Sequence, residues 1–320
     1  MHEQSLAGQA STAAEQATAS SAERSTPLKD FLWTLPQPLL VFGSMFAVAT
    51  AVTTQWMNAD LLTTIMIVLP LPLILVAERI WTKRKDWIPE PVELAEDAAW
   101  LAAGAFIWVP LYSDYYQTPI SDGFEWVRDS SGLAFSMAPE TTLGLVGAAL
   151  LAITLSEFIY YWLHRVQHES LFWWRIHGTH HHITKMSAAR GDRTHPLEWL
   201  ALMVSRPIIL ALLGASDDVI AVIVAFGFWQ GILNHSNLPL RSGVFGWFLS
   251  TAPMHHLHHS NHPVNSNTNY GCSIIIWDRL FGTYSGCTEI ESVGAGTGKP
   301  LSIRTQLAMA FYPDEKLKSL

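Results

Sequence analysis

Residues 156–182 read SEFIYYWLHRVQHESLFWWRIHGTHHH, and this stretch leads from an apolar segment into a cluster of histidines. His164 and His168 are four residues apart, which places both side chains on one face of an α-helix. Continued backwards, the same face carries Tyr161 and Glu157. The stretch therefore predicts a mostly apolar helix whose polar stripe ends in a pair of imidazoles.

Two further clusters repeat this histidine spacing. All histidines except His2 fall between His164 and His262, which is less than a third of the chain. Spacings of three and four residues again put imidazoles on one face of each helix. His235 stands alone near the end of a later apolar stretch and is a candidate for a ninth member. The eight clustered side chains expected to converge are His164, His168, His177, His180, His181, His255, His258 and His259.

This concentration of imidazole points to metal binding, because imidazole is a ligand that suits iron, zinc or copper. Eight or nine imidazoles are too many for one ion. They are enough for two ions that keep open positions for water or a bridging hydroxide. Because imidazole is neutral, we expect carboxylates to orient the rings and to balance part of the metal charge from outside the ligand set. The carboxylates available are Glu157, Glu169, Asp192, Glu198 and Asp278.

Four histidines within the same region are not counted in this set. His182, His256 and His262 lie off the preferred helical faces. His195 belongs to the segment RTHPLE at residues 193–198. It stays open between a role at the metals and packing at the start of a helix.

The composition is that of a membrane protein. The chain has 320 residues, of which 49% are hydrophobic and 14% are charged, against roughly a quarter charged in an ordinary soluble domain. The formal net charge of −8 gives no basic surface, so we expect no nucleic acid partner. Cys272 and Cys287 are the only cysteines, and we expect both to be free thiols.

Four apolar stretches are candidates to cross a bilayer, which takes about 20 helical residues. The second stretch contains Pro70 and Pro72, which should kink it. The third is short unless its flanks complete it, and the fourth leads into the first histidines. The four stretches cover residues 36–57, 61–77, 98–112 and 141–163.

A further apolar pair, residues 199–214 and 219–233, follows the second histidine cluster. Arg206 and Pro207 interrupt its first half, and an arginine at the centre of a bilayer costs several kcal/mol. We therefore expect a shallow helical hairpin that starts and ends on the histidine side. It should form a wall over the site rather than a plain transmembrane crossing.

Lysine and arginine in the short connections set the expected orientation. Four basic residues lie within 79–85 and five more within 164–193, whereas residues 58–60 have none and 113–140 have only Arg128. This pattern predicts a cytosolic N-terminus, two hairpins through the membrane, and histidine clusters that face the cytosol.

The expected fold is an all-α, integral-membrane protein with about four transmembrane helices and a cytosolic, histidine-rich helical cap that holds a di-metal site. Residues 1–30 are rich in Ser, Ala, Gln and Glu and lack the features of a signal peptide, so we expect a disordered cytosolic tail. We expect an N-terminal transmembrane region at 31–140, a catalytic domain at 141–290 and a C-terminal tail at 291–320.

With these motifs in place, the sequence resembles the fatty acid hydroxylase/sterol desaturase superfamily of membrane di-iron proteins, and above all its bacterial members with eight histidines. The resemblance rests on H-x-x-x-H at 164–168 and on H-x-x-H-H at 177–181 and 255–259. It covers about residues 140–285. Supporting segments are 193–198, 235–237, 269–271 and 277–283.

The resemblance implies two iron ions as cofactors, O2 as co-substrate, and electrons from a separate carrier such as a ferredoxin or a cytochrome b5-like protein with its reductase. It implies hydroxylation, or desaturation, of an unactivated C–H bond of a lipid, with the active site on the cytoplasmic side of a bacterial inner membrane. The eight clustered histidines would ligate the metals, and His235 would be an additional ligand. Catalytic residues beyond the metal site are not implied. Asn269 and Asp278 would brace the ligands, or else be an ordinary turn residue and a surface residue.

Three functions from other classes compete with this interpretation. A zinc hydrolase needs a carboxylate base beside its ligands, as in H-E-x-x-H, but Arg165 and Gly178 follow the leading histidines here. A metal transporter would place its ligands near mid-membrane, and a bis-histidine haem protein would need facing pairs within the spans. The sequence favours the oxidase over all three. The spacing of the ligands does not separate a hydroxylase from a desaturase.

Overall fold

The computed structural model describes residues 26–132 and 135–320, and within them the chain is helical, with isolated bridges as its only β-pairing. The predicted all-α membrane fold with a histidine-rich cap is confirmed, with one more candidate span than the four expected. Of the predicted tail at 1–30, residues 1–25 lie outside the described residues. The helices long and apolar enough to cross a membrane are Pro27–Thr53, Ala59–Ile80, Pro91–Ser130, Thr142–Glu169 and Asp217–His235.

The first two spans form a hairpin. α2 (Pro27–Leu32) leads through a short turn into α3 (Pro36–Thr53), and the chain returns through α4 (Ala59–Val68) and α5 (Pro70–Ile80). The returning span is interrupted between α4 and α5 because Pro70 has no N–H to donate to the preceding turn. The predicted kink is therefore present.

The third span is much longer than the apolar stretch 98–112 that predicted it. Pro91–Ser130 is one helical run of 40 residues, so the expectation that residues 113–130 form a connection is wrong. Two π-helical turns interrupt it. Such turns are rare in proteins, and those that occur are often found at functional sites. Its parts are α6 (Pro91–Ala103), η2 (Gly104–Trp108), α7 (Val109–Tyr112), η3 (Ser113–Gln117) and α8 (Thr118–Ser130).

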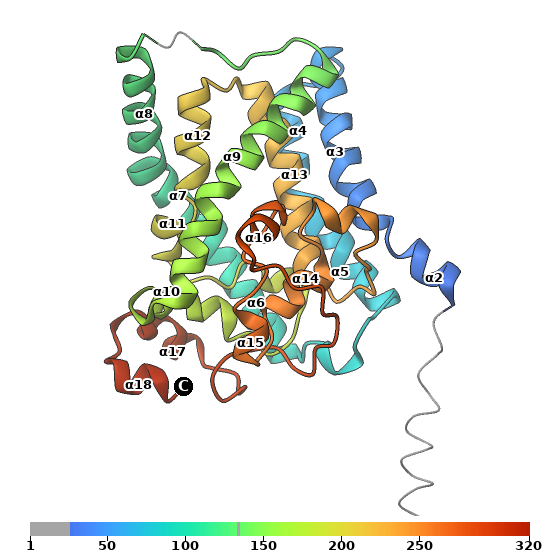
Figure 1. Ribbon diagram of the computed structural model, residues 1–320, viewed down its shortest axis with the longest axis vertical. Coiled ribbons are helices and arrows are strands. Elements are labelled where there is room, and N and C mark those ends of the chain that lie inside the picture. Colours follow the sequence, from blue (N-terminus) through green and yellow to red (C-terminus); the bar gives the residue numbers. More distant parts are fainter. Residues whose placement is uncertain (1–25, 133–134) are drawn as a thin grey trace, which may run out of the picture.

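The fourth span, α9 (Thr142–Glu169), carries the first two histidines at its end. The Thr141 hydroxyl accepts a hydrogen bond from the Gly144 amide and so caps the start of the helix. α9 packs against α3 and against the hairpin that follows it in sequence. Figure 1 shows α9 running obliquely through the molecule, from the upper right of the view down to α10 at the lower left.

The apolar pair forms α11 (Glu198–Ala201), α12 (Ser205–Leu213) and α13 (Asp217–His235). The turn between α12 and α13 meets the connection between the third and fourth spans. There the Met137 amide donates to the Gly214 carbonyl at 3.0 Å, and the Met137 carbonyl accepts from Ser216 at 3.1 Å. The hairpin therefore reaches the end of the molecule remote from the cap (Figure 1).

The expectation of a shallow hairpin is thus wrong, and the reason lies in the surroundings of Arg206. Its guanidinium is half-buried beside Gly227 of α13. The carboxylate of Glu157 on α9 interacts with it electrostatically. An arginine that faces the protein interior and a countercharge is tolerated at a depth where one facing lipid would not be.

The remaining elements form a cap at the opposite end of the molecule from the 214–216 turn (Figure 1). The C-terminal residues pack against this cap, since Met309 is fully buried and lies close to Gly178 of α10. The elements of the cap are η1 (Lys85–Trp87), α10 (Leu171–His181), η4 (Ala188–Arg190), η5 (Val244–Trp247), α14 (Ala252–His258), α15 (Pro263–Ser266), α16 (Ile276–Phe281), α17 (Ile303–Ala308), η6 (Met309–Phe311) and α18 (Asp314–Lys318).

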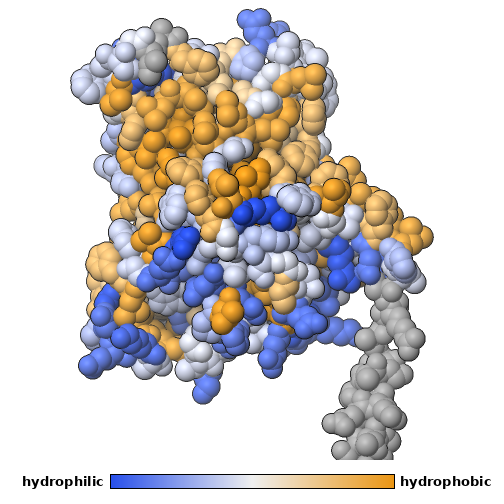
Figure 2. Space-filling view, viewed as in Figure 1, coloured by the Kyte–Doolittle hydropathy of each residue, from blue (hydrophilic) through white to orange (hydrophobic). Residues whose placement is uncertain are grey.

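The surface shows the same division. In Figure 2, hydrophobic side chains form a broad band over the spans, below a hydrophilic upper edge, and hydrophilic side chains gather over the cap. This is the distribution expected when the spans lie in hydrocarbon and the cap lies in water. The histidine-bearing ends of α9 and α13 lie where the two regions meet.

The depth of the α12–α13 hairpin can be tested by labelling single cysteines in a variant that lacks Cys272 and Cys287. Asp217 at the turn and Lys316 in α18 are both exposed. We predict that Asp217→Cys reacts with a membrane-impermeant maleimide only from the side opposite to the one that labels Lys316→Cys. A shallow hairpin would instead give labelling of both cysteines from the same side.

Candidate metal centre

The nine histidines singled out by the sequence converge on two neighbouring points. In each group, one ring nitrogen from every member lies within 4.8 Å of those of the others. Among the described residues, no other His, Cys, Asp or Glu belongs to either group. The first histidine group contains His164, His168, His177, His181 and His258, and the second contains His180, His235, His255 and His259.

Helical spacing sorts the side chains of α9 and α10 between the two groups. His164 and His168 are one turn apart on α9 and both join the first group. On α10, His177 and His181 are also one turn apart and face the same group. His180 lies on the neighbouring face of α10 and joins the second group. One short helix therefore serves both points.

α14 divides its histidines in the same way. His258 joins the first group, whereas His255 and His259 join the second. His235 reaches the second group from the last residue of α13. The two groups adjoin, because the rings of His181 and His259 stack with centroids 4.4 Å apart. The geometry is that of two neighbouring sites for metal ions.

Hydrogen bonds to the outer nitrogens fix the tautomers in the first group. Nδ1 of His164 lies against the carbonyl oxygen of Tyr270, and Nδ1 of His258 lies 2.8 Å from the carbonyl oxygen of Thr268. A carbonyl oxygen can only accept, so both Nδ1 atoms carry the proton. The lone pair of each neutral ring is then on Nε2.

A buried carboxylate does the same for the third ring. Nδ1 of His177 lies 3.0 Å from Oε1 of Glu198, whose second oxygen accepts from Gln167 at 3.1 Å. Glu198 is one of the carboxylates that the sequence offered for this purpose, and its side chain is 3% exposed. A carboxylate behind a ligating histidine fixes the ring and makes its other nitrogen more basic.

The inner nitrogens consequently face one another. Nε2 of His164 lies 2.9 Å from Nε2 of His177 and 3.1 Å from Nε2 of His258. In the second group, Nε2 of His235 lies 2.9 Å from that of His255 and 3.2 Å from that of His180. In the first group the tautomers direct these lone pairs at one another, an arrangement that a cation between them stabilises. The residues therefore fit a metal ion in each group.

Burial keeps the rings in the neutral form that metal binding requires. It lowers the pKa of His258 to about 3. Burial first, and neighbouring imidazoles second, hold the pKa of His180, His181, His255 and His259 well below the usual range. Because the charged form is the one that burial disfavours, these five imidazoles are uncharged at neutral pH. No proton has to leave before a cation binds.

Asp278 and Asn269 brace this centre from behind. Asp278 accepts hydrogen bonds from the amides of Tyr270 and Gly271, each at 2.8 Å, and the Tyr270 carbonyl in turn holds His164. Asn269 has a φ of 55°, a left-handed backbone conformation that asparagine tolerates. Its side chain binds the backbone of Met254 and Ser285. These contacts favour the bracing role over the turn-and-surface alternative.

Other residues that the sequence offered lie away from the two groups. Glu157 accepts from the amide of Ser273, and Glu169 pairs with Arg165 on the surface. His195 lies at the start of α11, with its two ring nitrogens bonded to backbone atoms of Leu307 and Leu197. The structure thus places His195 at a helix start. The histidines left out of the set, His182, His256 and His262, also lie outside both groups, and Asp192 belongs to neither group.

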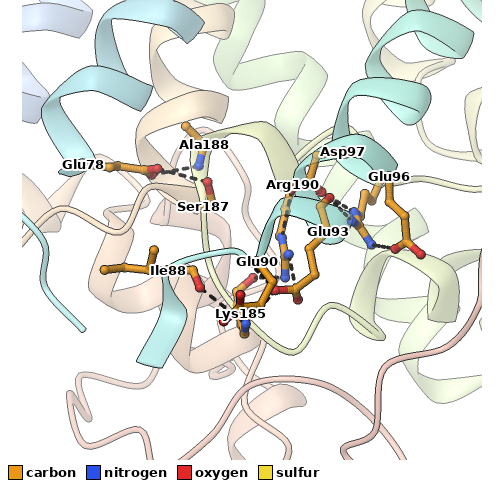
Figure 3. Close-up of polar contacts among 11 residues, drawn as sticks. Glu78, Ile88, Glu90, Glu93, Glu96, Asp97, Lys185, Ser187, Ala188 and Arg190 are labelled. Carbon is orange, nitrogen blue, oxygen red and sulfur yellow. Dashed lines mark hydrogen bonds and ion pairs between the residues drawn. The ribbon is translucent and has the colours of Figure 1, made fainter. Parts of the chain in front are cut away.

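A buried ionic network supports the second group from the side of α6, and sequence reasoning did not find it. Asp97, 2% exposed, pairs with both Arg190 and Arg193, and Glu93 pairs with Arg190 and Lys185 (Figure 3). The network holds the 185–193 segment in place. The only signal in the sequence is the presence of charges at the start of an apolar span.

The same segment touches a candidate ligand. A Cβ on Gly191 would lie 2.9 Å from Nδ1 of His235, so that only glycine lets the backbone pass so close to the ring. Glu78 on α5 fixes the preceding turn by accepting from the Ser187 hydroxyl and the Ala188 amide, at 3.0 and 2.8 Å (Figure 3). Charges buried in the second and third spans thus position the second group.

Comparison with known proteins identifies the family of the chain. The family model "Fatty acid hydroxylase" matches residues 149–283. The ornithine lipid hydroxylase OlsE of Rhizobium tropici is 30% identical over 275 residues, which cover 84% of this chain and 80% of that protein. The chain belongs to the fatty acid hydroxylase family. No solved structure matches the chain at a significant level.

More distant relatives match less than half of the chain. The human alkylglycerol monooxygenase is 27% identical over 157 residues, covering 49% of this chain and 34% of that protein. A very-long-chain aldehyde decarbonylase, GL1-5 of Oryza sativa subsp. indica, is 29% identical over 152 residues, covering 43% of this chain and 24% of that protein. Relatives with different names thus share part of this chain.

We predict that each group loses its metal separately. His177→Ala removes a member of the first group and His180→Ala a member of the second, so each variant should retain about half of the metal of the unchanged protein. Metal content is measured by elemental analysis of purified protein. His262→Ala is the control, because His262 is exposed and outside both groups. Full metal content in both variants would contradict the assignment.

A second prediction concerns the carboxylate behind His177. Glu198→Gln should weaken metal binding by roughly 10- to 100-fold, because the amide no longer supports the ring as a carboxylate does. The measurement is competition for the metal with a chelator of known affinity. Glu169→Gln is the matched control, since Glu169 is exposed and paired only with Arg165. Equal affinities of the two variants would refute a role for Glu198.

Proposed function

We propose that this protein is a membrane oxygenase that hydroxylates an unactivated C–H bond of a lipid. The observation that carries the proposal is the convergence of nine imidazoles on two adjoining points where the spans meet the cap. Relatives named as a lipid hydroxylase and as a monooxygenase support this reaction class. The protein's membrane-spanning helices support a substrate that resides in the bilayer.

Each histidine group would hold one iron ion. Neutral imidazole nitrogens suit iron, and the two groups offer five and four of them. When bound, the two ions would supply the activation of O2 and the oxidation of the C–H bond, with two electrons delivered from outside the protein. All further contributions come from the side chains of the chain itself.

Those side chains preset the centre and keep water out. Glu198 and the Tyr270 carbonyl hold His177 and His164 with Nε2 turned inward, so neither of these rings has to reorient when a metal binds. His181 and His258 are fully buried. A centre preorganised and shielded in this way protects a strong oxidant from reaction with solvent.

The spans would bring the substrate to the centre. α9 and α13 both run from the apolar region of the molecule and end at the histidine groups, the former in His164 and His168 and the latter in His235. A lipid chain that lies along these helices reaches the centre without leaving an apolar environment. The methylene next to the metals is then the one that reacts.

The proposed orientation rests on the basic residues at the end of the second span. Arg79 lies in the last turn of the second span, and Lys83 and Arg84 follow it on the cap side. By the positive-inside rule, such residues favour the cytoplasmic side. We therefore propose a cytoplasmic active site in a bacterial inner membrane. Its electron donor is a cytoplasmic carrier such as a ferredoxin or a cytochrome b5-like protein with its reductase.

The geometry disfavours the functions from other classes. A zinc hydrolase needs a free carboxylate base, but Glu198 is occupied by His177 and Gln167. A bis-histidine haem would need space for a porphyrin between two rings, whereas His181 and His259 stack directly. A transporter would carry its ligands within the bilayer rather than where the spans enter the cap. Desaturation of the same C–H bond would use the same centre. Analysis of the lipid product distinguishes desaturation from hydroxylation.

The proposal is tested by reconstituting the purified, iron-loaded protein with native membrane lipids, a reduced ferredoxin and heavy-isotope O2. We predict lipids that gain one labelled oxygen atom by mass spectrometry, and no such product from His258→Ala. Lipids that lose two hydrogens without gaining oxygen would identify a desaturase. No new lipid, together with zinc as the only bound metal, would refute the proposal.

A further inference from the structure

A pocket in the cap lies outside the histidine groups and has no part in the proposed function. Its volume is about 190 Å³. One wall is the 242–247 segment, which contains η5, and the other is formed by α16 and the residues that follow it. Among the described residues, its lining contains Arg279 as the one charged side chain and no Asp or Glu. We call it the Arg279 pocket.

The Arg279 pocket lies at the level where the spans meet the cap. On one side, the indole Nε1 of Trp277 donates to the Thr154 carbonyl of α9 at 3.0 Å. On the other side, the ring of Phe248 packs against that of Phe42 on α3, with centroids 6.4 Å apart. Figure 1 shows α16 at mid-height, above α14 and α15. Both walls of the pocket therefore adjoin membrane-spanning helices.

Exposed apolar side chains flank the pocket. Val244, Trp247 and Leu280 are 74%, 69% and 66% exposed, and Trp247 lines the pocket itself. At the end of a membrane-spanning region, such side chains lie in the headgroup layer of the bilayer, where tryptophan and tyrosine are enriched. The Arg279 pocket therefore lies beside lipid headgroups.

Arg279 brings a positive charge into this pocket. Its Cζ lies 3.7 Å from the centre of the Tyr284 ring and 4.4 Å from that of the Trp247 ring. Nη2 donates to the Gly246 carbonyl at 2.8 Å, and Nε is buried without a hydrogen-bond partner in the chain. Arg279 makes no ion pair with any residue that the structure describes. Most of the five N–H donors of this guanidinium are thus available to a ligand.

The neighbouring carboxylate does not balance this charge. Asp278 accepts hydrogen bonds from the amides of Tyr270 and Gly271, at 2.8 Å each, and from the Thr283 hydroxyl at 2.7 Å. It is occupied in bracing the histidines and does not line the pocket. An arginine that stacks on aromatic rings and keeps its donors available is suited to bind an oxyanion, to which it can donate two parallel hydrogen bonds.

We propose that the Arg279 pocket binds the phosphate group of a membrane lipid. The hydroxyls of Tyr284 and Thr288 also line the pocket, and these additional donors suit the several oxygens of a phosphate. The volume of about 190 Å³ is several times the roughly 30 Å³ that one water molecule occupies. Inorganic phosphate has the same chemistry, but the exposed apolar side chains around the pocket favour a phosphate that carries hydrocarbon chains.

A bound headgroup fixes the cap at the membrane surface. Pro253 and Met254 at the start of α14 line the pocket, and His255 of the second histidine group is the next residue. The lipid therefore holds the start of the helix whose histidines serve both groups. This site goes beyond the proposed function, and its occupancy can be measured without turnover.

The test is a titration of the full-length protein, purified in a neutral detergent, with three probes and native mass spectrometry as the readout. The probes are a short-chain phosphatidate, the diacylglycerol with the same chains, and inorganic phosphate. We expect phosphatidate to bind more tightly than either of the others. Arg279→Gln should weaken phosphatidate binding roughly tenfold or more, as expected for lost hydrogen bonds to a charged group, and leave diacylglycerol binding unchanged. Arg304→Gln, which alters an exposed arginine of α17, is the control.

A second variant keeps the inference testable if Arg279→Gln does not fold. Trp247→Leu changes an exposed side chain and removes one of the two rings against the guanidinium. It should weaken phosphatidate binding roughly two- to fivefold. Equal phosphatidate binding by the unchanged protein and by the variants that fold would overturn the inference. Inorganic phosphate bound as tightly as phosphatidate, or diacylglycerol bound as tightly as phosphatidate, would also overturn it.

Discussion

The centre depends on one constraint, which is that the outer nitrogens of three imidazoles in the first histidine group are tied to acceptors. The carbonyls of Tyr270 and Thr268 and the carboxylate of Glu198 each accept a hydrogen bond from Nδ1 of one ring. The inner nitrogens of these rings are left as acceptors that face one another in a buried space. A cluster of neutral lone pairs is stable only with a cation between them, so the surrounding protein specifies a metal before one binds.

The rest of the fold supplies these acceptors and holds them. Asp278 fixes the turn that presents the Tyr270 carbonyl, and Asp97 fixes the segment that packs behind His235 through two buried arginines. Removing one partner of a buried ion pair is costly, because the other charge is left uncompensated. The polar interior of the cap is therefore a scaffold for the imidazoles, and the spans connect it to the bilayer.

The local features of the site could be predicted from the sequence, because they follow from helical periodicity. The spacings that start at His164, His177 and His255 place the right side chains on common faces, and the structure brings all nine candidates together. Periodicity does not reveal which acceptor lies behind each ring. The roles of the Tyr270 carbonyl and of Asp97 depend on contacts between segments that lie far apart in the chain.

The depth of the membrane-embedded hairpin could not be predicted for a related reason. The cost of an arginine in hydrocarbon argued for a shallow hairpin, but that cost applies to a side chain that faces lipid. Arg206 faces Gly227 and the charge of Glu157 instead. The length of the third span could not be predicted from hydropathy either, because its polar ends continue the helix beyond the apolar stretch.

The most direct test of a di-iron centre built from imidazole is X-ray absorption at the iron edge, measured on protein purified with iron. We predict about two iron ions per chain, a first shell of nitrogen and oxygen atoms, and the scattering pattern of several imidazole rings on each iron. A single iron per chain, sulfur in the first shell, or too few imidazoles to account for both histidine groups would contradict it.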